Sequence, residues 1–268
     1  FISFTGTSVT PDYDVYLRET LTDSSDLDPG CGDPGPGGGQ LASLAGTWVG
    51  TGNDHFISGG VNYFDYEVSV AMDGSGNISE ILLNSVAESV TGIVTAEDDN
   101  FYTIEFDDVS TGQLLVDDTF TYMVFIRNTG FADNTDMFFS VLQKGASGAA
   151  AAGYPKYSSV ALFSGFGYDY CGVTDDFYRF EPASLFVEPE SGGSLGMPVQ
   201  GIGPLGNFDA NLLLWQPQFG WWNGLDTSGG DLHLFLSPDG MFAGAYHQVR
   251  ASLYLWPGEF AFYALTKQ

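Results

Sequence analysis

Side chains that carry oxygen atoms recur at alternate positions in the segment DGSGNISE, as Asp73, Ser75 and Asn77. Such a set suits Ca²⁺, which takes about six to eight oxygen ligands from carboxylates, amides and backbone carbonyls. The segment begins like an EF-hand loop, but Ile78 stands where that loop needs Gly, and Asn84 stands where it needs a bidentate Glu. The segment is therefore not an EF-hand, and the alternative to a calcium site is an Asp-rich turn that satisfies its own backbone.

A second group of acidic side chains lies in the segment FADNTD, which carries Asp133 and Asp136. Further acidic pairs stand in the segments EDDN and FDDV. We expect calcium as the only cofactor of the chain, held at one or more of these clusters. Tight turns are the competing explanation for each cluster, because Asp and Asn side chains accept hydrogen bonds from turn backbones.

The residues that usually perform catalysis form no familiar grouping. The histidines are His55, His233 and His247, and neither a GxSxG elbow nor another known nucleophile context is present. His233 alternates with Leu232 and Leu234, which predicts that its side chain lies on the opposite face of a strand. A zinc ion between His233 and His247 would lack a third ligand, so ordinary strand residues are the alternative. We expect no enzymatic activity.

Aromatic residues and glycine are both abundant. The chain of 268 residues contains 22 Phe, 14 Tyr and 36 Gly. This composition is typical of many short strands joined by tight turns. Trp215, Trp221 and Trp222 could form a platform for a sugar, but we favour a place for them in the core or at an interface.

The charge of the chain is strongly negative, with 34 acidic and 7 basic residues and a net charge of −27. Seven scattered cations cannot form the basic surface that nucleic acid requires, and an anionic membrane surface is disfavoured for the same reason. The acidity suits either solubility in salt water or the binding of divalent cations. No stretch reaches the length of about 18 apolar residues that a transmembrane helix needs.

The two cysteines are Cys31 and Cys171. Because the chain begins with Phe1, we expect a processed product that is located outside the cytoplasm, either secreted or at the cell surface. Cysteines pair readily in such a compartment. A Cys31–Cys171 disulfide is therefore expected, and two free thiols are the alternative.

The chain divides into an arm and a body. From Val9 to Arg18 the arm alternates apolar and polar residues, as a half-buried strand does. Residues 29–39, with the sequence PGCGDPGPGGG, can form neither a helix nor a central strand. The body is all-β, with turns expected at Asp73-Gly74 and Pro238-Asp239-Gly240, and its regular turn spacing predicts an antiparallel barrel or sandwich. The expected organisation is an N-terminal arm and tether 1–39, a first β unit 40–144, a linker 145–156 and a second β unit 157–268, or one continuous β domain 40–268.

A Gly-x-Trp motif occurs once in each half, at Gly46 and Trp48 and at Gly220 and Trp222. The motif resembles the opening strand of the calycins, the lipocalin and avidin group of small antiparallel barrels. The resemblance covers a few residues in each half and carries over no ligand residue. It implies a barrel in which the Trp packs across one end, beside a pocket for a small apolar ligand. Both motifs extend to GxWxG and precede an Asp-Gly turn, so they indicate either two related β units or a coincidence.

Two functions are open. The first is a non-catalytic structural subunit that assembles with copies of itself into a fibre or surface array, because a tethered strand can add to the sheet edge of a neighbour. The second is a soluble extracytoplasmic binding protein that holds a small apolar ligand in a calycin-like barrel, beside Trp48 and Trp222. The arm side chains that would fill pockets on a neighbour are Val9, Tyr13, Val15 and Leu17.

Overall fold

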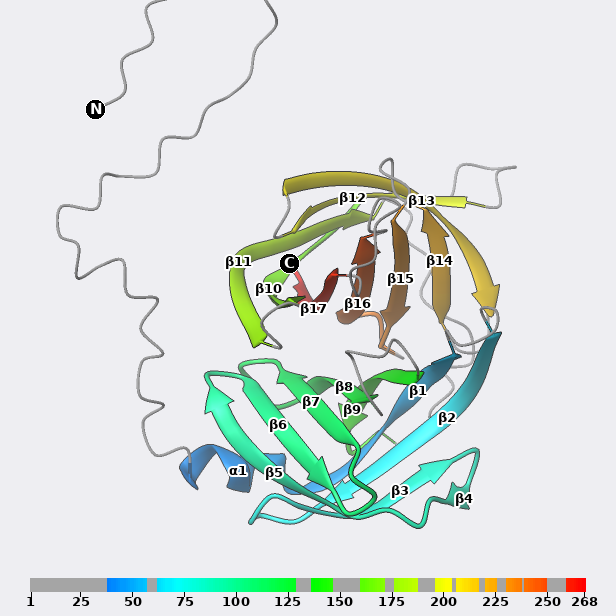
Figure 1. The fold of residues 1–268 in the computed structure, drawn as a ribbon. Coiled ribbons are helices and arrows are strands. Elements are labelled where there is room, and N and C mark those ends of the chain that lie inside the picture. Colours follow the sequence, from blue (N-terminus) through cyan, green and yellow to red (C-terminus); the bar gives the residue numbers. More distant parts are fainter. Residues whose placement is uncertain are drawn as a thin grey trace, which may run out of the picture. The chain divides into compact units, whose positions relative to one another are not determined.

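The computed structural model shows two closed antiparallel β-barrels and, among the residues that it describes, one short helix (Figure 1). One compact unit, from Pro36 to Gln268, contains both barrels. The structure describes residues 38–56, 62–128, 136–146, 160–171, 176–187, 196–203, 206–216, 220–225, 230–237, 239–249 and 259–268.

Eight strands form the first barrel, and each one pairs antiparallel with the next along the chain. The barrel closes because the last strand pairs with the first, from Trp48 opposite Lys144 to Phe56 opposite Asp136. A short strand, β4 (Val86–Ala87), pairs only with β3. The barrel strands are β1 (Gly46–Phe56), β2 (Asn62–Met72), β3 (Asn77–Leu83), β5 (Gly92–Asp98), β6 (Phe101–Phe106), β7 (Thr111–Val116), β8 (Tyr122–Asn128) and β9 (Asp136–Lys144).

Alternation along these strands gives the first barrel an apolar interior. Trp48, Val68 and Leu114 belong to its core cluster and are at most 1% exposed. Successive side chains of a strand point to opposite faces, so alternate residues such as Val68 and Val70 join this core. The expected hairpin at Asp73-Gly74 is confirmed, since β2 and β3 flank that turn.

The helix α1 (Gly38–Leu44) covers one end of the first barrel (Figure 1). The Trp48 Nε1 atom donates a hydrogen bond to the Leu44 carbonyl at 2.8 Å, and the Lys144 Nζ atom donates one to the Ser43 carbonyl at 2.6 Å. The prediction that residues 29–39 contain no helix is wrong at its last two positions, because α1 begins at Gly38. Burial of Leu44 against the barrel outweighs the low helix propensity of the glycines.

Eight further strands form the second barrel, again in sequence order, and β17 pairs with β10 to close it. The expected turn at Asp239-Gly240 is confirmed between β15 and β16. Closure of both barrels decides the fold in favour of a barrel over a sandwich. The strands are β10 (Ala161–Cys171), β11 (Asp176–Val187), β12 (Gly196–Gly203), β13 (Gly206–Gln216), β14 (Trp221–Leu225), β15 (Asp231–Leu236), β16 (Phe242–Val249) and β17 (Glu259–Lys267).

Each barrel has a glycine at the seam where its first strand meets its last. A Cβ atom at Gly50 of β1 would overlap the Val141 carbonyl oxygen, and one at Gly165 of β10 would overlap the Ala264 carbonyl oxygen. This close approach lets each first strand bend sharply against the closing strand. The strand that corresponds to β1 is therefore β10, whereas the second GxWxG motif lies on β14, the fifth strand of its barrel. The two motifs do not mark equivalent positions of a repeat.

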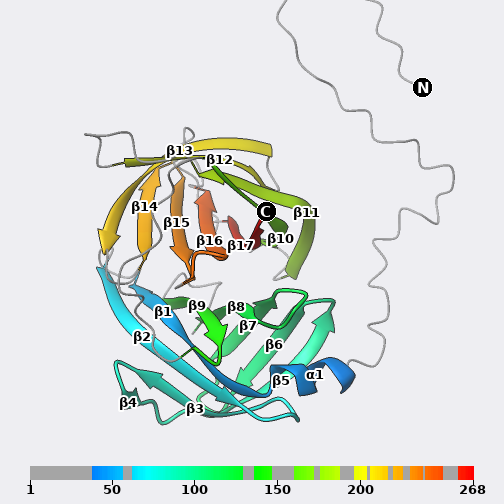
Figure 2. The ribbon, with the colours of Figure 1, turned by 180° about the vertical axis from the view of Figure 1, so that it is seen from behind.

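The outer walls of the two barrels pack against each other through a cluster rich in aromatic residues (Figure 2). Strands β15 and β16 contact β9, β16 and β17 contact β8, and β17 contacts β7. At the centre, the Phe139 ring lies 5.0 Å from the Tyr246 ring and 5.4 Å from the Phe235 ring, measured between centroids. All three side chains are fully buried, so apolar burial holds the barrels together.

Candidate functional site

The inner face of the first barrel carries aromatic residues at the end opposite α1. Asp54 of β1 lies directly opposite Phe64 of β2 and Phe138 of β9. Asp54 is an even number of residues from Trp48 on the same strand, so both side chains point to the inner face. Phe64 and Phe138, as the cross-strand partners of Asp54, point to that face as well. Asp54 lies six residues beyond Trp48 along β1, which places it roughly 20 Å from that residue, towards the end opposite α1. We call Asp54, Phe64, Tyr66 and Phe138 the distal cluster.

Exposure rises sharply along β2 towards this end. Val70 and Val68 are 0% and 1% exposed, Tyr66 is partly exposed, and Phe64 is 53% exposed. Because exposed apolar surface costs free energy in water, a half-exposed Phe on the inner face of a barrel marks surface that a ligand could cover. Phe138 is likewise only partly buried.

A continuous series of aromatic rings leads from the distal cluster into the barrel. The Tyr66 ring lies 6.1 Å from the Phe138 ring, which lies 6.2 Å from the Phe125 ring. The Phe125 ring in turn lies 6.4 Å from the Phe106 ring in an edge-on geometry. These separations are within the range in which aromatic rings attract each other, so the cluster rests on a packed aromatic wall.

Charges of both signs lie at the distal cluster, since three carboxylates act on Tyr66 and Arg127 lies directly opposite Phe138. Burial raises the pKa of the Tyr66 hydroxyl, and the charges of Asp54, Glu88 and Asp65 raise it further. Three carboxylates thus act on this one hydroxyl. Burial also raises the pKa of Asp65 to about 6; this residue lies beside Tyr66 in the chain but on the outer face.

Arg127 of β8, directly opposite Phe138, already has an acidic partner. Arg127 forms an ion pair with Asp108, and its Nε atom donates a hydrogen bond to Ser110 Oγ at 3.0 Å. The guanidinium also lies over the Phe106 ring, 5.1 Å from its centroid. A hydrogen bond from the Ser110 hydroxyl, with a smaller contribution from Arg127, holds the pKa of Asp108 below its usual value. The Asp108 charge therefore offsets that of Arg127.

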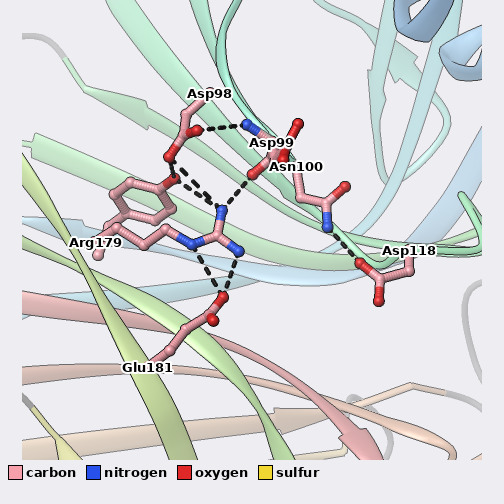
Figure 3. A network of polar contacts seen from close by, with 7 residues as sticks. Asp98, Asp99, Asn100, Asp118, Arg179 and Glu181 are labelled. Carbon is pink, nitrogen blue, oxygen red and sulfur yellow. Dashed lines mark hydrogen bonds and ion pairs between the residues drawn. The ribbon is translucent and has the colours of Figure 1, made fainter. Parts of the chain in front are cut away.

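A polar network links the turn between β5 and β6 to the second barrel (Figure 3). Arg179 donates to Glu181 and to the Asp99 carbonyl, and it lies 3.7 Å from Asp98. The Tyr168 hydroxyl donates to Asp98 at 2.9 Å. Burial raises the pKa of Tyr168, with opposing contributions from Arg179 and Asp98. These groups satisfy one another, so the network is a structural contact between barrels.

A second contact of the same kind lies at the turn between β15 and β16. The Tyr122 hydroxyl of the first barrel donates to Asp239 of the second, and the Tyr122 ring stacks on Phe242 at 5.3 Å. Although partial burial raises the pKa of Asp239, hydrogen bonds from Tyr122, Ser237 and Met241 hold it below its usual value. Each barrel thus donates one tyrosine hydroxyl to an aspartate of the other.

The inner face of the second barrel is filled by its own side chains. A Cβ atom at Gly167 would overlap the Phe180 ring, and one at Gly201 would overlap the Phe208 ring. These rings occupy the space that the glycines leave. The buried inner residues also include the large side chains Phe163, Trp222 and Tyr263.

The histidines of the second barrel point to different faces. His233 stacks on Tyr246 at 4.3 Å on the outer wall, as its alternation with Leu232 and Leu234 predicted. His247 lies opposite Leu232 on the inner face, 5.1 Å from the Phe208 ring. The two imidazoles therefore cannot share a zinc ion across the hairpin.

The predicted calcium donors at Asp73, Ser75 and Asn77 do lie together, but as a turn. Asp73 Oδ1 accepts the backbone N–H groups of Ser75 and Asn77 at 2.8 and 2.9 Å, and Oδ2 accepts the Asn77 side-chain amide at 2.7 Å. These bonds, led by the amide of Asn77, lower the pKa of Asp73. Throughout the part of the chain that the structure describes, no group of three or more His, Cys, Asp and Glu side chains converges. Asp133 and the side chain of Asp136 lie outside the described residues, and calcium stays a prediction.

Other predicted residues have mixed outcomes. Trp48 and Trp222 are 0% and 1% exposed in the interiors of their barrels, and Trp221 is buried between the barrels. Trp221 and Trp222 therefore lie in the core or at an interface, as we favoured over a platform for a sugar. Outside the described residues lie Val9, Tyr13, Val15, Leu17, Cys31 and the side chains of Cys171 and Trp215.

Sequence reasoning missed the distal cluster. Only the alternation of Tyr66, Val68 and Val70 was visible, and it extends back to Phe64 in the segment NYFDYEV. Asp54 and Phe138 come from two other strands, so no local pattern joins them to Phe64. The single helix described, α1, has seven residues and is too short to span a membrane.

The chain matches no family model and no curated protein. Among solved structures, it is similar to a protein of unknown function from the DUF3598 family of Nostoc punctiforme, with 8% identity, a TM-score of 0.38, and 85% of this chain and 99% of that chain covered. It is also similar to a mutant of Transferrin Binding Protein B, a vaccine antigen from Haemophilus parasuis, with 8% identity, a TM-score of 0.39, and 84% and 76% covered. The assignment of the fold rests on the strand pairing described above.

Proposed function

We propose that the chain is a non-catalytic binding protein whose first barrel takes a small ligand with an apolar body at the end opposite α1. The observation that carries the proposal is Phe64, an inward-facing aromatic residue that remains 53% exposed in a closed barrel. Covering such a ring stabilises a complex through apolar burial and ring stacking. An extracytoplasmic location belongs to the same proposal.

The two ends of the first barrel support this role. At one end, α1, Trp48 and Lys144 cover the interior and are tied together by hydrogen bonds. At the other end, Phe64 and Phe138 stand on either side of Asp54 and keep part of their surface in water. A ligand would therefore enter at the distal end and stop against the buried aromatic wall.

A fluorescence titration with Nile red, a neutral apolar dye, tests the proposal. We expect saturable binding to the full chain and about tenfold weaker binding after Phe64→Ala or Phe138→Ala, because each change removes one stacking ring. Phe186→Ala is the matched control, since Phe186 is 40% exposed on the outer face of the second barrel. Binding that does not saturate, or that falls equally in the control, would overturn the proposal.

A further inference from the structure

The inner face of the first barrel meets solvent over about one level of side chains at the distal end. This row, which we call the mouth level, consists of direct cross-strand partners on β2, β1, β9 and β8: Phe64, Asp54, Phe138 and Arg127. Two residues deeper along the same strands lies the second level, which consists of Tyr66, Gly52, Ser140 and Phe125. Two residues of strand span about 6.6–6.8 Å, so one level is about as deep as a single aromatic ring.

Exposure to solvent ends at the second level. At the mouth level Phe64 is 53% exposed and Phe138 is partly exposed, whereas Phe125 is 1% exposed and Ser140 is fully buried. Tyr66 is the one member of the second level that keeps partial exposure. The next level down is at most 1% exposed and consists of Val68, Leu142, Met123 and Val116. A ligand can therefore cover the mouth level, and the barrel's own side chains fill the interior below it.

Phe125 forms the end of the accessible space, and its neighbours hold it there. Its ring lies 6.2 Å from the Phe138 ring and 6.4 Å from the Phe106 ring, nearly edge-on in both cases. The Ser140 hydroxyl donates a hydrogen bond to the Phe125 carbonyl at 3.3 Å, so this hydroxyl is already used within the wall. Edge-on rings attract each other, and a close-packed ring has little room to move aside. The end of the site is therefore a fixed apolar surface.

We propose that Phe125 sets the depth of the ligand site, so that the first barrel selects a rigid ring compound over a long alkyl chain. The inference rests on the proposed function and names the class of ligand. A flat ring system can lie across Phe64 and Phe138 and gain from stacking on both. A long chain would need the interior of the barrel, where Phe125 lies, so its remaining methylenes would stay in water and add no affinity.

Displacement of Nile red by two matched alcohols tests this selection. The probes are 2-naphthol, whose carbons form fused rings, and 1-decanol, which has the same number of carbons in one chain. We expect 2-naphthol to bind at least about tenfold more tightly, although the chain has the larger apolar surface to bury. Across straight-chain alcohols from 1-butanol to 1-decanol, affinity should rise about fourfold per methylene at first and level off before decanol.

Truncation of Phe125 should change the selection. Phe125→Ala removes the end of the site, so the levelling should move to longer alcohols and the preference for 2-naphthol should fall about tenfold. A purely structural role of Phe125 would lower both affinities alike. Phe163→Ala is the matched control, because it removes a fully buried ring from the interior of the second barrel, and it should leave the preference unchanged.

The outcomes separate this inference from the proposed function. Failure of Nile red to bind the unmodified chain would overturn the proposed function itself. If Nile red binds but 1-decanol binds as tightly as 2-naphthol, the depth limit is overturned and the apolar site stands. A preference that Phe125→Ala leaves unchanged, or that Phe163→Ala lowers equally, would contradict the role of Phe125. If Phe125→Ala does not fold, as judged by circular dichroism, Phe125→Leu takes its place, and the alcohol series on the unmodified chain still decides the depth limit.

Discussion

The two barrels share one topology and differ in what fills them. Both are eight-stranded antiparallel meanders whose last strand pairs with the first, and both have a glycine at that seam. In the first barrel, α1 and Trp48 cover one end, and Phe64 keeps half its surface exposed at the other. In the second barrel, Phe163, Trp222 and Tyr263 are buried in the interior, and the Phe180 and Phe208 rings lie over Gly167 and Gly201.

This difference shows that strand topology alone does not make a binding site. A barrel of about eight strands has room inside for side chains or for one small ligand. The second barrel uses that room for its own rings, whereas the first leaves aromatic surface uncovered at one end. The proposed ligand site therefore belongs to the first barrel, and we propose a supporting role for the second.

The largest expected effect comes from Trp48→Ala. Removing this fully buried side chain and its hydrogen bond to Leu44 should lower the free energy of unfolding by about 3–5 kcal/mol. Leu213→Ala, at a residue 48% exposed on the outside of the second barrel, should cost less than about 0.5 kcal/mol. Urea unfolding measures both, and similar costs for the two changes would contradict the role of Trp48 in covering the first barrel.

A smaller effect should follow Gly201→Ala in the second barrel. The added methyl group would overlap the Phe208 ring, so overpacking should cost about 1–3 kcal/mol. Gly74→Ala is the control, because the nearest atom to its new Cβ would lie 3.9 Å away. Thermal unfolding compares the two variants. If Gly201→Ala is as stable as the control, the interior of the second barrel has free room and the contrast between the barrels fails.

The contacts that join the barrels should contribute less. Tyr168→Phe removes the hydroxyl that donates to Asp98 and accepts from Arg179, and should cost about 1 kcal/mol. Asp98 and Arg179 are partly exposed, so water can replace much of the hydrogen bonding that the Tyr168 hydroxyl provides. Unfolding in urea measures the cost, and Tyr178→Phe, at an exposed position on β11, is the matched control. A cost equal to that of the control would show that the network adds nothing to the junction.

The smallest expected effect concerns the pH dependence of stability at Asp65. Its folded pKa of about 6 lies above the value of 3.8 for an ordinary Asp, so the folded state binds the proton more tightly. Stability should therefore fall as the pH rises from about 4 to 6, by about 1 kcal/mol or less, because the half-buried group is partly screened by solvent. Asp65→Asn should remove this slope in urea unfolding measured at several pH values. An unchanged slope in that variant would show that another group carries it.

The local structure could be predicted from the sequence, and the closure of the barrels could not. Alternation around Tyr66 and Val68 and the Asp-Gly turns predicts hairpins, which the structure confirms. Closure depends on pairs such as Trp48 with Lys144, which lie far apart in the chain and leave no local pattern. The helix α1 escaped prediction because its stability comes from packing against the barrel, and its first residues are glycines.

The candidate site was harder to foresee for the same reason. The Gly-x-Trp resemblance places Trp48 inside a barrel end, and the structure agrees. It does not reveal Asp54, Phe64 and Phe138, because three strands bring them together. Acidic turns also mimic metal sites in sequence, since Asp73 binds its own turn through the same oxygens that would bind calcium.

A crystal structure of the full chain with bound Nile red would test the central claim, a site for an apolar ligand in the first barrel, most directly. We predict difference density at the distal end of the first barrel, with the ring system of the dye against Phe64 and Phe138. Density inside the second barrel, with the distal cluster unchanged, would contradict it.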